Sequence, residues 1–301
     1  MFKMIETNKF KIKIAKNVGF CFGVKRAINL AERAINKKNQ KVYTLGPIIH
    51  NPQEVKRLKN QGIAILKNID NLKNASVILR THGIPFELHK TLIMNRTIDI
   101  IDATCPFVKR AQKIVWQLSD DNIKFKNALT VLIGEKIHPE VIALVSYATD
   151  KKCLVLENID EARFFFTKKK RINVVSQTTQ TPTNFNNIVG ILKKRYKVKV
   201  YNTICEATLD RQESAKKLSN NVDLMIVVGG KNSGNTTKLA QICSMKTKTY
   251  HIETVDDLKK KWFKKLKTIG LVTGASTPSW IIKNIINGLK NMFLCIISLS
   301  F

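Results

Sequence analysis

The chain of 301 residues contains six cysteines, and three of them share one setting, a short apolar or loop stretch that runs into an amphipathic helix pattern. They are Cys21 in GFCFGVKRAINLAERA, Cys105 in DATCPFVKRAQKIVWQL and Cys205 in TICEATLDRQESAKKLS. Spacings of 84 and 100 residues give each third of the chain one such thiol, as in a pseudo-threefold protein. Three thiolates brought to one point would form a soft-metal site with one coordination position left over.

The alternative explanation is three unrelated buried thiols, because free cysteines commonly behave as small hydrophobic residues. Against it, each predicted helix starts at its cysteine and carries a cation one turn later, and both features favour the thiolate that a metal needs. These cations are Lys25, Lys109 and Arg211. Structural zinc usually takes closely spaced cysteine pairs, so the spacing favours an iron-sulfur cluster. We interpret the remaining cysteines as structural: Cys153 in a strand pattern, Cys243 in mid-helix and Cys295 in the C-terminal tail.

Histidines and a carboxylate form a second group of reactive side chains. The segment HPE at 138–140 places His138 beside Glu140, which would suit proton delivery, although a lone loop glutamate is more often a solvated surface residue. His50 and His82 would each, taken alone, be loop histidines. Three such histidines without an acidic triad favour hydrogen bonding to an oxyanion over nucleophilic catalysis.

Two loops between a strand pattern and a helix pattern could hold a phosphate. In GGKNSGNTTKL, Ser233, Asn235 and neighbouring backbone N–H groups could do so, although the segment lacks the GK[ST] of a P-loop. GASTPSW is a second polar loop of this kind, between a strand pattern and a helix pattern. We predict Ser276 or Thr277 at the helix N-cap and Pro278 at the first helical position. Plain helix capping is the alternative. The two loops together favour a phosphorylated ligand.

These side chains follow strand patterns that alternate with helix patterns along the chain, which predicts an α/β protein with parallel sheets. The strand patterns are KIKIAKNV, KVYTLG, ASVILRTHG, ALTVLIG, NVVSQ, KVKVYNTI, DLMIVVGG and TIGLVTG. Ligands of such sheets bind beyond the carboxyl ends of the strands, where the candidate residues fall. No low-complexity linker separates the thirds. We expect domains at 22–104, at 105–199, and at 1–21 joined with 200–301.

The formal net charge of +30 raises the alternative of a nucleic-acid-binding protein. The basic clusters are scattered, however, and no nucleic-acid recognition motif accompanies them, so we expect neither nucleic acid nor a membrane as partner. A positive surface would instead attract an anionic substrate and an acidic redox protein. The N-terminus lacks the apolar core of a signal peptide, and the C-terminal run MFLCIISLSF is shorter than the roughly 20 residues that span a bilayer. We therefore expect a cytoplasmic location.

Taken in order, the motifs resemble the 4-hydroxy-3-methylbut-2-enyl diphosphate reductase family over nearly the whole chain. They are GFCFGVKRAI, IIHNPQEV, THG, DATCPFV, HPEV, QTT, TICEAT followed by RQ, GGKNSGNT and GASTP. The resemblance implies a trefoil of three α/β domains around a central 4Fe-4S cluster held by Cys21, Cys105 and Cys205, with one iron free of protein ligands. It implies reductive dehydroxylation of the substrate to isopentenyl and dimethylallyl diphosphates, the last step of the non-mevalonate isoprenoid pathway. A small acidic ferredoxin or flavodoxin would supply the electrons.

The resemblance also assigns roles to single residues. Glu140 would be the proton source, acting through Thr178, with Thr179 beside it. The substrate's diphosphate would contact His50, His82, His138, Ser233, Gly234, Asn235 and Ser276. The chain departs from the family pattern at Gly234, where a second serine is usual, at Glu135, where a histidine is frequent, and at Ser279, where an aspartate is frequent. A different three-cysteine cluster enzyme, such as a hydro-lyase, is the nearer alternative.

Overall fold

The computed structural model describes residues 2–7, 9–37, 40–66, 68–69, 72–125, 128–149 and 152–292. Strands and helices alternate along this part of the chain. Their order and bounds are β1 (Lys3–Glu6), β2 (Lys11–Ile14), α1 (Phe22–Asn36), β3 (Lys41–Leu45), α2 (Pro52–Asn60), β4 (Ile63–Leu66), β5 (Ala75–Leu79), α3 (Phe86–Met94), β6 (Ile98–Asp102), α4 (Pro106–Phe125), β7 (Ala128–Ile133), α5 (Pro139–Ser146), β8 (Cys153–Leu156), α6 (Ile159–Phe164), β9 (Arg171–Ser176), α7 (Pro182–Lys193), β10 (Lys197–Tyr201), α8 (Glu206–Ser219), β11 (Leu224–Val228), α9 (Gly234–Ser244), β12 (Thr249–Ile252), η1 (Val255–Asp257), η2 (Lys260–Phe263), β13 (Thr268–Thr273) and α10 (Ser279–Asn291).

The chain divides into two compact units. Unit 1 comprises Met1–Phe22, His50–Glu54 and Glu206–Phe301. Unit 2 comprises Gly23–Ile49 and Val55–Cys205.

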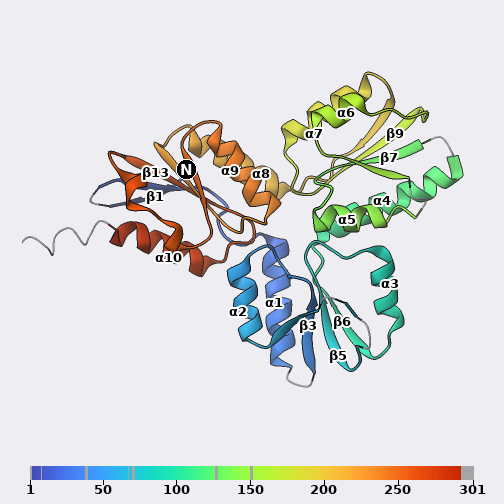
Figure 1. Cartoon of the computed structure of the whole chain (residues 1–301), viewed down its shortest axis with the longest axis horizontal. Helices are drawn as coiled ribbons and strands as arrows, with labels where there is room; N and C mark the ends of the chain where they lie inside the picture. The colour runs from blue at the N-terminus through green and yellow to red at the C-terminus, as the bar shows by residue number, and fades with distance from the viewer. Residues whose placement is uncertain are drawn as a thin grey trace, which may run out of the picture. The chain divides into compact units, whose positions relative to one another are not determined.

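Unit 1 contains a five-stranded sheet in the order β1-β2-β13-β11-β12, in which only the β1–β2 pair is antiparallel. Ile281 and Ile285 of α10 belong to the core cluster on one face of this sheet, and Leu218 of α8 and Leu239 of α9 belong to the cluster on the other (Figure 1). All five residues of β11 are buried, as expected for a central strand of a parallel sheet with helices on both faces.

Unit 2 contains two four-stranded, entirely parallel sheets in the orders β4-β3-β5-β6 and β10-β9-β7-β8 (Figure 1). Leu92 of α3 packs in the core of the first sheet. Val115 of α4 and Leu144 of α5 pack in the core of the second. Every strand of these sheets except β4 is followed by a helix, and the loops between strand and helix carry the chemistry-bearing residues.

The α/β class with three parallel-sheet units, predicted from the alternating patterns, is confirmed. Four strands were not predicted from the sequence: β1, β4, β6 and β12. Each of them lies at an edge of its sheet and is partly exposed. β1, β6 and β12 mix polar with apolar residues, whereas β4 is apolar throughout but only four residues long. The antiparallel pairing of β1 with β2 departs from the expectation of parallel sheets alone. The predicted three-domain division stays a prediction.

Two local expectations were wrong in detail. Cys243 is the penultimate residue of α9 rather than a mid-helix residue. The N-cap of α10 is Pro278, one residue after Thr277 and two after Ser276, the two predicted caps, and it makes no side-chain capping bond. Pro278 is therefore not the first helical residue, which is Ser279. Cys295 and most of the apolar C-terminal run lie outside the described residues. Among the described helices, none is both long and apolar enough to cross a bilayer.

Candidate active site

Cys21, Cys105 and Cys205 each stand immediately before a helix, namely α1, α4 and α8. Their backbone N–H groups make the same contact in all three cases. They donate to the carbonyl oxygens of Ala275, Thr81 and Thr178, at 3.0, 3.0 and 2.9 Å. Each acceptor lies two residues after the end of a parallel strand, β13, β5 or β9. The cysteines therefore start their helices at the carboxyl ends of three sheets, as the sequence predicted.

The three cysteines form no disulfide within the described part of the chain and are of intermediate exposure, whereas Cys153 and Cys243, which also form none, are buried. Burial raises the pKa of the Cys243 thiol to about 12, so it stays protonated at neutral pH. A Cβ atom on Gly23, which follows Cys21 by two residues, would lie 2.5 Å from the Sγ atom of Cys105. Only glycine leaves room for the Cys105 sulfur at this position, a constraint that we did not predict from the sequence.

Within the described part of the chain, no three His, Cys, Asp or Glu side chains group closely enough to hold a single metal ion. A single ion would need three such side chains around one point. In an iron-sulfur cluster each cysteine binds a different iron, so such a cluster does not require a grouping of that kind.

Glu140 is the second residue of α5, and its side chain is 1% exposed. His138 is the N-cap and Pro139 the first helical residue, so a strand-to-helix loop delivers the carboxylate into the protein instead of to solvent. The carboxylate accepts hydrogen bonds from the backbone N–H and the hydroxyl of Thr178, at 2.6 and 2.8 Å. The alternative prediction, that Glu140 is a solvated surface residue in a loop, is therefore wrong.

Thr178 connects this acid to one of the cysteines. Its N–H and hydroxyl hold Glu140, while its carbonyl accepts the N–H of Cys205 at 2.9 Å. The neighbouring hydroxyl of Thr179 is buried and makes no hydrogen bond. Gln177, which the sequence analysis did not select, accepts the Glu135 N–H through Oε1 at 3.0 Å. The acid, two hydroxyls and one thiol thus belong to one end of the sheet that contains β7 and β9.

Two of the predicted histidines contact each other in unit 2. The rings of His82 and His138 pack edge to face, with their centroids 5.7 Å apart. Nδ1 of His138 accepts the Glu140 N–H at 3.1 Å, which leaves the proton of a neutral His138 ring on Nε2. His138 is therefore oriented as a donor through Nε2.

In unit 1 the structure brings His50 beside two of the predicted phosphate loops. The Ser276 hydroxyl donates to the His50 carbonyl at 2.9 Å, and a Cβ on Gly230 would lie 2.6 Å from the same carbonyl oxygen. Ser233 is the N-cap of α9 and accepts the Thr236 N–H at 3.4 Å. Gly234 is the first residue of this helix.

Asn235, in the first turn of α9, is 5% exposed, and both polar atoms of its amide lack a hydrogen-bond partner. Buried amides normally have partners, because an unsatisfied one destabilises the fold. An anion at the start of α9 would satisfy the amide N–H and the backbone N–H groups of the first turn.

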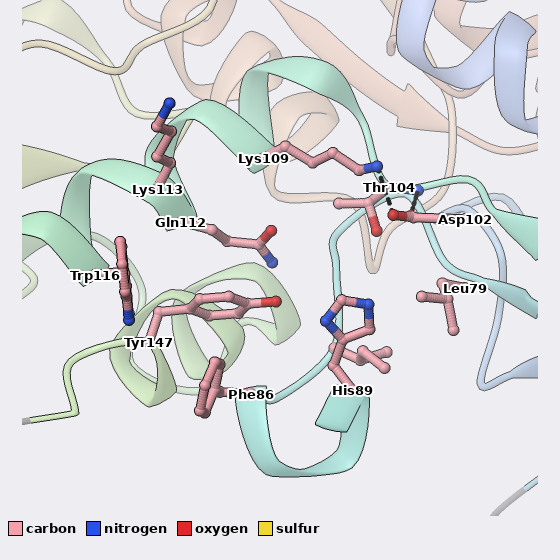
Figure 2. A pocket seen from close by; sticks show the side chains of 11 residues that line it. Leu79, Phe86, His89, Asp102, Thr104, Lys109, Gln112, Lys113, Trp116 and Tyr147 are labelled. Atoms are coloured by element: carbon pink, nitrogen blue, oxygen red, sulfur yellow. Dashed lines mark hydrogen bonds and ion pairs between the residues drawn. The ribbon is translucent and has the colours of Figure 1, made fainter. Parts of the chain in front are cut away.

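A separate pocket of about 330 Å³ lies beside Cys105 in unit 2, lined among others by Phe86, Asp102, Lys109, Trp116 and Tyr147 (Figure 2). Asp102 binds the Lys109 ammonium at 2.5 Å and the Thr104 N–H at 2.9 Å. Burial alone would raise the pKa of Asp102, but these hydrogen bonds outweigh it and lower the pKa. Burial, and then the Asp102 charge, raise the pKa of Tyr147. None of the residues predicted for the site lines this pocket.

Parallel sheets with a buried acid, hydroxyls and thiols at the strand ends define an α/β enzyme whose site uses helix N-termini. The family model of the LytB protein matches residues 12–290 of the chain. The 4-hydroxy-3-methylbut-2-enyl diphosphate reductase of Aquifex aeolicus is 47% identical over 278 residues, covering 91% of this chain and 94% of that protein. The enzyme of the same name from Syntrophotalea carbinolica is 42% identical over 284 residues, covering 94% and 99%.

Two solved structures are also similar. One, of (E)-4-hydroxy-3-methyl-but-2-enyl diphosphate reductase, the terminal enzyme of the non-mevalonate pathway, is 43% identical with a TM-score of 0.67, covering 97% of this chain and 100% of that one. The other, of the E-1-hydroxy-2-methyl-but-2-enyl-4-diphosphate reductase from Plasmodium falciparum, is 28% identical with a TM-score of 0.84, covering 93% and 87%. The chain belongs to the LytB family. The predicted family, and with it the predicted reductase of the non-mevalonate pathway, is confirmed.

Proposed function

We propose that this chain converts 4-hydroxy-3-methylbut-2-enyl diphosphate to isopentenyl and dimethylallyl diphosphates with one 4Fe-4S cluster, bound by Cys21, Cys105 and Cys205, in which one iron has no protein ligand. The observation that carries the proposal is the repeated contact of the three cysteines. Each begins a helix and donates its N–H to a strand-end carbonyl.

The thiols fit such a cluster. All three are outside disulfides and partly exposed, and each stands at the positive end of a helix, which stabilises a thiolate. Gly23 lies two residues after Cys21, and because it has no Cβ atom, the Cys105 sulfur can lie against it. Cys243, whose raised pKa keeps it protonated, does not fit a ligand.

The net reaction takes up an electron pair and two protons, breaks the C–O bond of the substrate's hydroxyl, forms a C–H bond and releases water. When bound, the cluster supplies a Lewis-acidic iron for the substrate oxygen and a route for the electrons. Glu140 supplies a proton to the leaving oxygen. Because a hydroxyl both donates and accepts, Thr178 can bind either protonation state of Glu140 across their 2.8 Å hydrogen bond.

The diphosphate would take its hydrogen bonds from side chains that offer donors at strand ends and helix starts. We assign it to His50, His82, His138, Ser233, Gly234, Asn235 and Ser276. Within the described part of the chain the amide of Asn235 is unsatisfied, which supports this assignment most directly. We assign the substrate's hydroxymethyl group to Thr178 and Thr179, beside Glu140. Gly234 would contribute only its backbone N–H. Ser276 would have to release the His50 carbonyl, because its one hydroxyl proton is donated there and a diphosphate oxygen needs a donor.

A small acidic ferredoxin or flavodoxin in the cytoplasm is the electron donor that we propose, since the chain has a net charge of +30 and no nicotinamide or flavin fingerprint. Turnover with such a donor should slow as added salt screens the encounter over about 10 Å at 0.1 M. Turnover with a small chemical reductant gives the control. A rate with the protein donor that does not respond to salt would contradict electrostatic partnering.

The cluster is tested by anaerobic purification with iron and sulfide analysis. Replacing Cys21, Cys105 or Cys205 by serine should remove the brown chromophore and the activity, because an alkoxide is a poor substitute for a soft thiolate. Cys153→Ser and Cys243→Ser are the matched controls and should keep both. Equal loss of iron in all five variants would reject the ligand assignment. Loss of water from the substrate in the absence of any reductant, without formation of these two products, would instead favour a hydro-lyase.

A further inference from the structure

Two arginines connect the helix that follows one cysteine with the loop that precedes another. Arg26 lies in the first turns of α1, after Cys21, and Arg211 in the first turns of α8, after Cys205. Both guanidinium groups donate to backbone carbonyl oxygens in a loop that leads to a different cysteine. A guanidinium suits this task, because its planar fork can donate to two acceptors at once.

Arg26 holds the loop of Cys105. Its Nη2 donates to the carbonyl of Asp102 at 3.0 Å and its Nη1 to the carbonyl of Thr104 at 3.3 Å. The same loop is held from its other side, because the Asp102 carboxylate binds Lys109 and the Thr104 N–H (Figure 2). The backbone between the end of β6 and Cys105 is thus fixed by side chains of α1 and α4.

Arg211 holds the loop of Cys21. Its Nη2 donates to the carbonyl of Gly19 at 2.8 Å and its Nη1 to the carbonyl of Asn17. The N–H of Gly19 donates to the Thr273 hydroxyl at 2.8 Å, so the loop is also tied to the end of β13. Arg211 is only 5% exposed. A cation buried among carbonyl dipoles is costly and is stabilised by any anion nearby.

The third loop is held differently. Thr203, two residues before Cys205, exchanges hydrogen bonds through its hydroxyl with the backbone N–H and carbonyl of Ser176. Arg110 follows Cys105 at the interval by which Arg26 follows Cys21, and it is exposed. The exposed Arg110 therefore supplies a matched control for the loop contacts of Arg26 and Arg211.

We propose that Arg26 and Arg211 are positioning residues for the cysteine ligands: Arg211 sets the backbone of Cys21, and Arg26 sets that of Cys105. The inference rests on the proposed cluster. It adds a second role for Arg211, whose buried positive charge stabilises the added electron and so raises the reduction potential of the anionic cluster. The helix after Cys205 thus fixes Cys21, and the helix after Cys21 fixes Cys105.

The test compares Arg26→Gln, Arg26→Lys, Arg211→Gln and Arg211→Lys with the control Arg110→Gln. Each protein is reconstituted anaerobically, and the iron retained under a chelator is measured with the reduction potential. Loss of such supporting contacts typically weakens metal binding about 10- to 100-fold, so both Gln variants should lose iron faster by that factor. Only Arg211→Gln should also lower the potential markedly. Arg211→Lys keeps the charge, and it should restore the potential while iron loss stays fast.

Iron loss and potentials equal to those of Arg110→Gln would overturn the proposal. Circular dichroism and thermal unfolding of the apoproteins show whether the variants fold. If Arg211→Gln does not fold, the positioning role is tested by Arg26→Gln alone, because Arg26 is partly exposed and its replacement should leave the fold intact. The proposed cluster is judged separately: if Cys21→Ser and Cys105→Ser lose iron while the arginine variants do not, the ligand assignment stands and the positioning role fails.

Discussion

Glu140 and Asn235 are both buried polar residues near the start of a helix, but their hydrogen bonding differs. Both carboxylate oxygens of Glu140 are bound by Thr178, at 2.6 and 2.8 Å. Neither amide atom of Asn235 has a hydrogen-bond partner. The exposed fractions of the two side chains are nearly the same, 1% and 5%, so burial alone does not account for the difference.

The difference separates two kinds of site residue. A group that must transfer a proton benefits from a fixed orientation before substrate arrives, and Thr178 gives Glu140 that orientation. A group that only binds the substrate can stay unsatisfied until the ligand supplies its partner, at the expense of stability in the free protein. On this comparison, changes at Glu140 should affect turnover, whereas changes at Asn235 should affect affinity.

The largest effect is expected for Glu140→Gln. Glutamine keeps the size of the side chain, and the Thr178 hydroxyl can turn to accept from its amide, so the fold and substrate binding should persist. Loss of the acid should lower kcat by about 10²- to 10⁴-fold. Anaerobic substrate titration in parallel with turnover measures both quantities. Near-wild-type kcat would remove Glu140 from proton delivery.

Asn235→Leu should come next. Hydrogen bonds to a charged group contribute about 1.5–3 kcal/mol, so losing one to the diphosphate should raise KM roughly 10- to 100-fold with little change in kcat. The melting temperature of the free protein should not fall, because the amide atoms that are removed were unsatisfied. An unchanged KM combined with a lower melting temperature would show a structural residue instead.

Thr178→Val should have an intermediate effect on turnover. The backbone N–H still binds Glu140 at 2.6 Å, but the hydroxyl that holds the other carboxylate oxygen is lost. We expect kcat to fall about tenfold, in line with a net loss of roughly 1.4 kcal/mol for one hydrogen bond. Thr178→Ser keeps the hydroxyl and should recover most of the rate. Equal rates for the Val and Ser variants would argue against a role of the hydroxyl.

The smallest effect is expected for Ser233→Ala. The serine caps α9 through a long contact of 3.4 Å to the Thr236 N–H, so its removal should lower the free energy of unfolding by no more than about 1 kcal/mol. If Ser233 also binds the diphosphate, KM should rise while kcat stays constant. Denaturant unfolding and steady-state kinetics separate the two roles, and an unchanged KM would leave Ser233 as a cap only.

Much of the architecture could be predicted because buried parallel strands such as Leu224–Val228 are continuous apolar runs that local composition reveals. The missed strands lie at sheet edges; three of them mix polar with apolar residues, and the fourth, β4, is apolar but only four residues long. The cysteines could be selected in the same way, since a thiol that precedes a helix pattern is a local feature. The cap of α10 was misplaced by one or two residues, because the Ser276 hydroxyl donates to the distant His50 carbonyl and the Thr277 hydroxyl to the Val228 carbonyl instead of capping the helix.

The sequence by itself determined which residue types follow which strands: thiols at three helix starts, an imidazole next to a carboxylate, and polar loops before α9 and α10. The family resemblance connected Glu140 with Thr178, but the residues alone could not show the hydrogen bonds that join them across 38 residues. Nor could they show that Asn235 lacks a partner among the described residues, or that Arg211 and Arg26 hold the loops of other cysteines. Those facts depend on hydrogen bonds between segments far apart in the chain. Local propensity specifies where a helix or strand begins, but only the packed tertiary structure decides which distant donor meets which acceptor and which buried group is left unsatisfied.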